Sequence, residues 1–285
     1  MKALLVGLSA WALTACSTTG HSTSHQSVSI EFAAEINGIP FACGQSYPGI
    51  GATRSTITPS DLRLYVSELK LIRADGQAVP LELNQDGVWQ HQNVALLDFE
   101  NGTGPCRNGT PPTNTSVRGV VPAGRYTGLE LTVGVPFNLN HQDPTVASAP
   151  LNSTAMFWNW QGGYKFIKFD TASSGISDQR PAAPMAMGPV TRYSVHLGST
   201  VCASASRTQA PGSCLNPNRI TVRLDRFDLK QGQVVIDMGA VLAQANVDVN
   251  AQGTSPGCMS FPKDADCPPI MGALGLTYDL SLIHI

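Results

Sequence analysis

The chain has 285 residues, enough for one large or two small domains with a substantial hydrophobic core. Only 13% of the residues are charged and the formal net charge is −2, so no basic face is available for nucleic-acid phosphates and we expect no nucleic-acid binding. Low charge together with 27 Gly and 20 Pro is typical of exported proteins built from short strands and turns.

Residues 1–16 have the features of a lipoprotein signal peptide. Lys2 supplies a positive charge, and the apolar run over 3–13 is too short to span a bilayer. The run ends in Leu13-Thr14-Ala15-Cys16, which resembles the bacterial lipobox, whose cysteine receives a diacylglycerol. We therefore expect cleavage before Cys16, lipidation of Cys16 and a periplasmic protein held to the membrane by this anchor alone. Ser17 after the cysteine favours the outer membrane, and the alternative is an ordinary signal peptide with a chance cysteine.

The two ends of the remaining chain are not expected to belong to the folded domain. Residues 17–26 form a polar tether without a hydrophobic period, and its His21 and His25 are interpreted as solvated. Residues 280–285 look like the translation of a transposon-adapter end from a sequencing library, and are therefore not expected to be native. One domain is expected over residues 27–279.

Cysteine usage agrees with export. Apart from Cys16 the chain has six cysteines, Cys43, Cys106, Cys202, Cys214, Cys258 and Cys267. An even number in an exported chain indicates disulfides. The short Gly-, Pro-, Ser- or Ala-rich loops 202–214 and 258–267 suggest local pairing, which leaves Cys43 with Cys106. A zinc site is the alternative, but the chain lacks a CxxC pair.

Strand patterns follow one another along the domain. Residues 27–36 alternate weakly and precede Asn37-Gly38, a strong hairpin signal. Residues 62–71 alternate with one slip that a bulge would absorb. Asp75-Gly76 and Asp86-Gly87 are turn signals before the next two strands. Further strands are predicted at 79–83, 88–99, 117–121, 128–135, 155–169, 191–201, 220–229 and 234–238.

The connections complete the predicted fold. Gln231-Gly232 is expected to close a hairpin between the last two strands, and 101–115 and 173–187 are expected to be long loops. Only 240–245 suggests a helical turn. About ten strands with regular turns predict an all-β, single β-sandwich or jelly-roll domain with long disulfide-tied loops.

Catalytic motifs are missing from the sequence. It has no GxSxG elbow, phosphate loop, dinucleotide fingerprint or HExxH motif. Once the tether and the last six residues are set aside, only His91, His141 and His196 remain, and nothing marks a serine that they could activate. The protein is therefore not expected to be an enzyme.

The densest chemical segment is 156–166, which places Met156, Trp158 and Trp160 on one face of a strand. The simplest interpretation is an aromatic core strand, because large rings bury much apolar area. Two Trp beside the Gly162-Gly163 turn would also suit a carbohydrate platform.

Several motifs together resemble one family. They are residues 89–99, residues 136–143, the Trp158-Asn159-Trp160 segment with the following Gly-Tyr-Lys-Phe, and residues 196–200 followed by Cys202. With the lipobox and the spaced cysteines, this set resembles the MbnP-like proteins, the four-Cys members of the metallo-mystery pair. The resemblance covers roughly residues 27–278, and WxW is its most specific part.

The resemblance implies a periplasmic copper-binding protein that works with a dihaem enzyme of the MauG/cytochrome c peroxidase superfamily. In that family the partner oxidises the first Trp of WxW to kynurenine, which here is Trp158. The change has a chemical rationale, because an indole nitrogen is only a hydrogen-bond donor, whereas kynurenine has an aniline nitrogen with a lone pair. Such a nitrogen with two imidazoles would suit one copper ion, expected as Cu(I).

The expected imidazole ligands are His141 and His196, since both lie inside the resembling motifs, and His91 ranks third because a related copper protein of methanotrophs uses a W-x-H arrangement. Around them Met156 could offer a soft sulfur and Asp143 could orient His141, with Trp160 as the second Trp of the motif. The alternative hypothesis is a lipid-anchored β-sandwich binding module, for carbohydrate or protein, without a metal site.

Overall fold

The longest strand, β4 (Ser55–Arg73), is the centre of the larger of two sheets. In the computed structural model, which describes residues 24–159, 161–176, 192–206 and 208–278, this sheet has nine strands. Its main path is β14 (Arg192–Leu197), β13 (Ile167–Ser173), β4, β10 (Tyr126–Val133) and β17 (Ile220–Leu224), with β3 (Tyr47–Ile50), β5 (Ala78–Pro80), β7 (Gln90–His91) and β8 (Val94–Asp98) attached beside it.

The expected slip in β4 is a bulge. The register between β4 and β10 shifts between Glu130 and Thr132, and Glu68 on β4 takes a left-handed φ of 54°. One extra residue in β4 thus keeps the apolar side chains on both sides of it facing the core.

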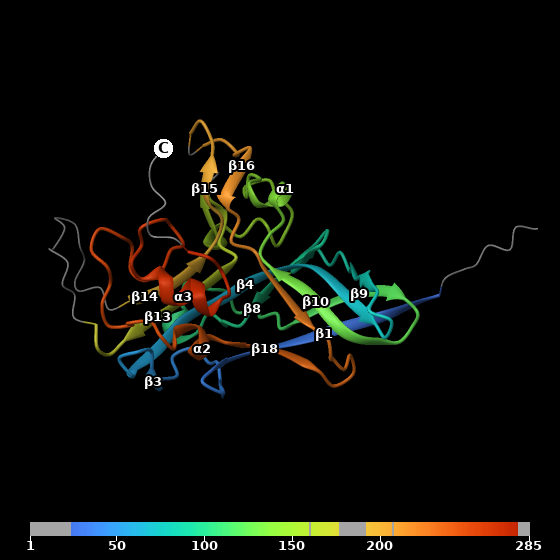
Figure 1. Cartoon of the computed structure of the whole chain (residues 1–285), viewed down its shortest axis with the longest axis horizontal. Coiled ribbons are helices and arrows are strands. Elements are labelled where there is room, and N and C mark those ends of the chain that lie inside the picture. The colour runs from blue at the N-terminus through green and yellow to red at the C-terminus, as the bar shows by residue number, and fades with distance from the viewer. Residues whose placement is uncertain (1–23, 160, 177–191, 207, 279–285) are drawn as a thin grey trace, which may run out of the picture.

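The second sheet has five strands and lies across the first (Figure 1). Its order is β18 (Gln233–Asp237), β1 (His25–Ile36), β9 (Ser116–Pro122) and β6 (Glu82–Leu83), with β2 (Ile39–Pro40) paired to β1. The Asn37-Gly38 hairpin is present, with both residues at positive φ as a type I′ turn requires. Strand β1 begins at His25, two residues before the predicted start of the domain, because His25 and Gln26 pair with β9.

One hydrophobic core lies between the sheets, as the all-β sandwich prediction required. Strand β1 contributes Ile30 and Ile36, which are fully buried, and β4 contributes Leu62 and Leu64. Each such side chain contributes roughly 1.5–3 kcal/mol on burial, so the core is the main source of stability for the sandwich.

The expected hairpin between the last two strands is wrong. Strand β17 pairs with β10 in the large sheet, whereas β18 pairs in parallel with β1 in the small one. The Gln231-Gly232 turn exists, since Gly232 donates its N–H to the Asp228 carbonyl at 2.6 Å, but it carries the chain from one sheet to the other. The turn signal at Gln231-Gly232 therefore marks a change of direction, but it does not show that the strands on its two sides pair with each other.

The predicted strand 79–83 is shared between β5 in the large sheet and β6 in the small one, and three other segments that were predicted as single strands are each divided. Residues 88–99 form the β7–β8 hairpin, residues 155–169 contain a 3-10 turn (Thr154–Met156), β11 (Phe157–Asn159), β12 (Gly163–Tyr164) and the start of β13, and residues 191–201 divide into β14 and β15 (Thr200–Ala203). Positive φ angles at Gln92 and Gly163 mark the turns of the first two divisions. The reversals created by the second and third divisions position the candidate site.

Helices are short and lie outside the sheets: a 3-10 turn (Gly104–Cys106), α1 (Phe137–Asn140), α2 (Met238–Leu242) and α3 (Cys267–Ala273). Asp237 caps α2 by accepting the Gly239 N–H at 2.8 Å. Helix α2 corresponds to the predicted turn, whereas α3 is too short to show a helical period. In the described part of the chain, no helix combines the length and apolar character needed to cross a membrane.

The three disulfides are the expected pairs, Cys43–Cys106, Cys202–Cys214 and Cys258–Cys267. Strands β15 and β16 (Ser213–Asn216) form a separate two-stranded sheet that projects from the sandwich beside α1 (Figure 1). Cys16, most of the tether, Trp160 and residues 280–285 lie outside the described residues.

Candidate metal centre

Trp158 lies in a slot between two chain reversals. Gly198 lies between β14 and β15, and a Cβ on it would come within 2.4 Å of Trp158 Cζ3. The indole therefore packs directly on the Gly198 backbone, in space that a side chain at this position would occupy. The Phe261 ring lies 5.3 Å from the Trp158 ring, centroid to centroid. Trp158 is only half-buried, which leaves part of the indole open for chemistry.

A cleft of about 640 Å³ adjoins this slot. Its lining includes Gly162, Thr200, Cys202 and Phe261. Gln161 Nε2 donates to the Cys202 carbonyl at 3.0 Å and so ties the β11–β12 hairpin to β15 across the cleft. The cleft therefore lies between the Trp158 hairpin and the projecting β15–β16 sheet.

His196 is on β14, two residues before Gly198. Its Nε2 lies 2.9 Å from Asp170 Oδ1 on β13. Burial lowers the pKa of His196, against the opposing effect of Asp170, so the imidazole is neutral at neutral pH. Burial alone would raise the pKa of Asp170, but hydrogen bonds from His196 and Ser194 and the charge of Lys168 hold it below its usual range. A neutral imidazole whose Nε2–H donates to a carboxylate has its lone pair on Nδ1, the atom that could bind a metal.

Asp170 belongs to a charged network on the outer face of the large sheet. Lys168 forms ion pairs with both Asp170 and Asp61, and the Arg63 guanidinium binds the Asp61 carboxylate through two nitrogens. This network positions His196, because it fixes the carboxylate that the imidazole contacts.

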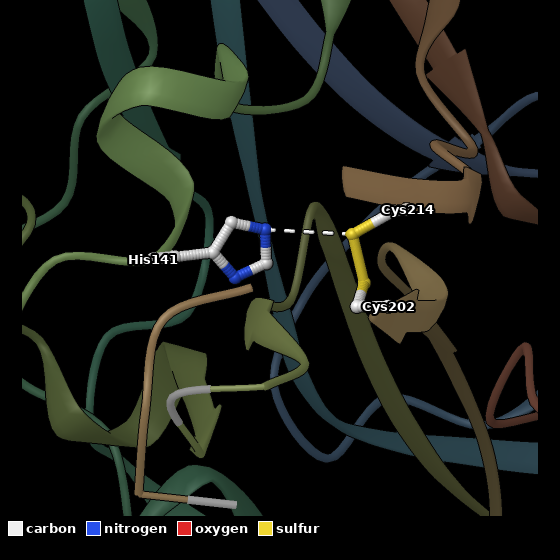
Figure 2. A group of neighbouring side chains, drawn as sticks. All are labelled: His141, Cys202 and Cys214. Atoms are coloured by element: carbon white, nitrogen blue, oxygen red, sulfur yellow. Dashed lines mark hydrogen bonds between the residues drawn. A yellow bond between two sulfur atoms is a disulfide. The ribbon is translucent and has the colours of Figure 1, made fainter. Parts of the chain in front are cut away.

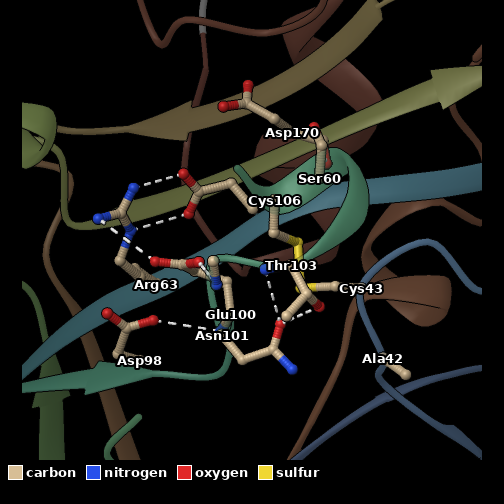
Figure 3. The surroundings of a disulfide bond; sticks show 12 residues. Ala42, Cys43, Ser60, Arg63, Asp98, Glu100, Asn101, Thr103, Cys106 and Asp170 are labelled. Atoms are coloured by element: carbon tan, nitrogen blue, oxygen red, sulfur yellow. Dashed lines mark hydrogen bonds and ion pairs between the residues drawn. A yellow bond between two sulfur atoms is a disulfide. The ribbon is translucent and has the colours of Figure 1, made fainter. Parts of the chain in front are cut away.

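The network continues to the Cys43–Cys106 disulfide, where Arg63 faces the fully buried Glu100 (Figure 3). Glu100 Oε1 accepts the Thr110 N–H at 2.7 Å and so holds the loop that carries Cys106. Burial and the Glu100 charge raise the pKa of the neighbouring Asp98 to about 7.

His141 follows α1 directly and is 6% exposed. Asn140 Nδ2 lies 3.1 Å from His141 Nε2, while Asn140 Oδ1 accepts the Tyr164 N–H at 2.9 Å. The Tyr164 bond fixes the orientation of the Asn140 amide, so its NH₂ group donates to His141 and the lone pair of that imidazole is on Nε2. The Phe137 ring packs against the imidazole at 4.9 Å between centroids.

The same His141 nitrogen faces the disulfide of the β15–β16 sheet. Nε2 lies 3.6 Å from Cys214 Sγ, and Figure 2 shows the imidazole directed at the sulfur pair. Over the described ranges, His141, Cys202 and Cys214 are the only His, Cys, Asp or Glu side chains that bring three ligand atoms within 4.8 Å of one another. With the sulfurs bonded to each other, this group offers one nitrogen ligand.

His196 and the surroundings of His141 are both connected to the Gly198 segment, on which Trp158 packs. Ser199 follows Gly198 and its Oγ is 3.4 Å from Asn140 Nδ2, so one short segment links the surroundings of both histidines to the Trp158 ring. The two imidazoles do not share a three-ligand cluster with a carboxylate or cysteine in the described part of the chain. Each of the two expected ligands is thus held by its own hydrogen bonds, His196 by Asp170 and His141 by Asn140.

A family model named MbnP matches residues 25–260. The chain belongs to the MbnP family. The solved structure of MbnP from Methylosinus trichosporium is similar at 29% sequence identity and a TM-score of 0.75, over 90% of this chain and 94% of that chain. A search of curated proteins gave no match. The matched residues include Trp158, His141 and His196.

The other residues expected to take part in this MbnP-family site have different surroundings. Met156 is fully buried in the hydrophobic core. Asp143 Oδ1 accepts hydrogen bonds from the Thr145 N–H at 2.8 Å and the Thr145 hydroxyl at 2.7 Å, and the side chains that contact His141 include Asn140 and Phe137. His91 is on β7, where its Nε2 lies 3.2 Å from Gln92 Nε2. Trp160 lies outside the described residues.

Sequence reasoning missed Asn140, Asp170, Gly198 and Phe261. Asn140 and Gly198 lie inside the resembling motifs, beside His141 and two residues after His196, so closer attention to those neighbours could have found them. Asp170 meets His196 only through the register between β13 and β14, and Phe261 reaches Trp158 because Cys258 and Ser260 bind the backbone of His196. No sequence signal marks either contact.

Proposed function

We propose that this protein is a lipid-anchored periplasmic copper carrier, and not an enzyme, whose copper site is completed when a dihaem partner oxidises Trp158 to kynurenine. Membership of the MbnP family supports a copper-related role. The carbohydrate- or protein-binding module is not favoured, since family and fold agree with the copper hypothesis.

The observation that carries this proposal is the packing of Trp158 on Gly198, which follows His196 by two residues and precedes Ser199, whose hydroxyl contacts Asn140 beside His141. Opening the indole at this position would create an aniline nitrogen in the half-buried slot. His196 would supply Nδ1 and His141 would supply Nε2, the nitrogens that carry lone pairs in this structure. Nitrogen ligands of this kind suit copper, which stands at the top of the divalent affinity order.

The test is to produce the protein in a periplasm with and without a MauG-like dihaem protein, and to measure intact mass, a peptide map across Trp158 and copper content. We expect the exchange of one carbon for one oxygen at Trp158 only with the partner, and copper only in the modified protein. Trp158→Phe keeps a ring in the slot but cannot form kynurenine, so it should lose copper. Trp89→Phe, outside the slot, is the matched control and should retain copper.

The two ligands are tested in the modified protein. His141→Ala and His196→Ala should each lose copper while Trp158 is still oxidised, which separates ligation from maturation. Copper bound equally well by protein with unmodified Trp158 and an intact Cys202–Cys214 disulfide would show that kynurenine is not a ligand and would refute the proposal.

A further inference from the structure

The Cys202–Cys214 disulfide differs from the other two in its surroundings. Cys258 and Cys267 are both part of the hydrophobic core, whereas each of the other two disulfides joins a buried cysteine, Cys106 or Cys202, to a half-buried one, Cys43 or Cys214. What sets Cys202–Cys214 apart is the cleft beside the Trp158 slot, which Cys202 lines. Exposed disulfides are the ones that thiol reductants reach most readily. This bond also closes the separate two-stranded sheet, so breaking it leaves both sheets of the sandwich and their core intact.

A nitrogen ligand is already positioned against the bond. His141 Nε2 is 3.6 Å from Cys214 Sγ, and the Asn140 amide fixes the imidazole in the form whose lone pair is on that nitrogen. The Nε2 atom and the two sulfurs lie within 4.8 Å of one another, a spacing that one metal ion can bridge with small side-chain movements. The disulfide prevents this, because a sulfur in an S–S bond is not a thiolate.

We propose that the Cys202–Cys214 disulfide is a redox-gated metal site, which on reduction becomes a His141–Cys202–Cys214 site for Cu(I). A dithiol reductant supplies two electrons and two protons, the S–S bond breaks to give two thiols, and the reductant becomes a disulfide. Cu(I) then binds the two sulfurs and His141 Nε2 and displaces the two thiol protons to solvent. Two thiolates and an imidazole form a soft donor set, which selects Cu(I).

The inference goes beyond the proposed function because it needs no kynurenine, although both use His141. Its test is therefore made on protein whose Trp158 is unmodified, as a peptide map can verify. The dependence of copper binding on Trp158 oxidation is measured separately, on protein with all three disulfides intact. Failure of either proposal thus leaves the other standing.

The experiment titrates the unmodified protein with dithiothreitol redox buffers of decreasing potential, alkylates the freed thiols and maps them. We expect Cys202 and Cys214 to become alkylated before the other four disulfide cysteines. The selectively reduced protein should then take up one Cu(I) in competition with a chromophoric chelator, and X-ray absorption should show sulfur around the copper. The Cys202–Cys214 bond of His141→Ala should be reduced in the same way. The Cu(I) affinity of this variant should fall by more than roughly tenfold, the loss typical of mutating a residue that only supports a metal ligand.

Cys202→Ser/Cys214→Ser is the second variant, and circular dichroism checks that its sandwich is folded. It should take up no Cu(I) under reducing conditions. Four outcomes would each overturn the proposal. Two concern the parent protein: reduction of Cys258–Cys267 before Cys202–Cys214, and equal Cu(I) uptake by the fully oxidised protein. The other two concern the variants: undiminished Cu(I) affinity in His141→Ala, and Cu(I) uptake by the folded double serine variant.

Discussion

Gly198→Ala should expel the Trp158 ring from its slot. The new Cβ would lie 2.4 Å from Trp158 Cζ3 and 2.9 Å from Cη2, against a lower limit of 3.4 Å for ordinary contact, so the ring would have to retreat by 1.0 Å. The Tyr164 carbonyl oxygen, 2.8 Å from the same Cβ, is backbone and cannot rotate away. Crowding of this kind costs about 1–3 kcal/mol of folding free energy.

Urea unfolding followed by circular dichroism measures that cost, and near-UV circular dichroism reports the displaced indole. Gly212→Ala is the matched control, because that glycine lies in the exposed loop between β15 and β16 and its new Cβ would meet nothing within 4 Å. We expect Gly198→Ala to lose stability while Gly212→Ala stays within about 0.5 kcal/mol of the parent, the usual range for surface changes. If the two variants were equally stable and their near-UV spectra matched the parent, the close packing of Trp158 on Gly198 would be refuted.

Three further variants test the surroundings of the site. The pKa of Asp98 is raised to about 7, so the folded state holds a proton that the unfolded chain releases near pH 4, and this group's stabilisation is lost as pH rises between these values. Asp98→Asn should therefore gain stability relative to the parent by up to about 1.4 kcal/mol per pH unit over that window, measured as urea midpoints from pH 5 to 8, and a constant difference would contradict the assigned pKa. Cys43→Ser/Cys106→Ser removes the crosslink that closes a loop of 63 residues and should lower the free energy of unfolding by about 4 kcal/mol in the same urea assay. An unchanged free energy of unfolding would show that this disulfide does not stabilise the fold. Asp170→Asn should weaken copper binding in the matured protein roughly 10- to 100-fold through His196, measured by chelator competition, whereas unchanged affinity would show that Asp170 does not position a ligand.

Local features of the fold were predictable from the sequence, and distant pairings were not. The Asn37-Gly38 hairpin follows from two residues that tolerate positive φ, and the bulge in β4 follows from one slip in an alternating pattern. The parallel pairing of β18 with β1 joins segments at opposite ends of the domain, and no local turn signal encodes it.

The candidate site shows the same division. Trp158, His141 and His196 could be selected from sequence because they lie in motifs that resemble the family. The Asp170 carboxylate could not, since it meets His196 only after β13 and β14 have set their register. Cysteine spacing predicted the Cys202–Cys214 bond, but the approach of His141 to it depends on how α1 packs beside β16.

Because β1 pairs in parallel with β18, the small sheet can be completed only after nearly the whole domain has been synthesised. The two strands and their flanking turn are joined by contacts such as the Asn37 N–H to Asp237 Oδ1 bond, across a sequence separation of 200 residues. During synthesis one edge of β1 therefore waits, with its hydrogen-bonding groups unpaired, until nearly the whole domain has followed it. Contacts between such distant segments form slowly, and an unpaired edge invites pairing with another chain. A truncation before residue 233 should thus release an aggregation-prone sheet edge, even though every strand of the large sheet precedes the cut.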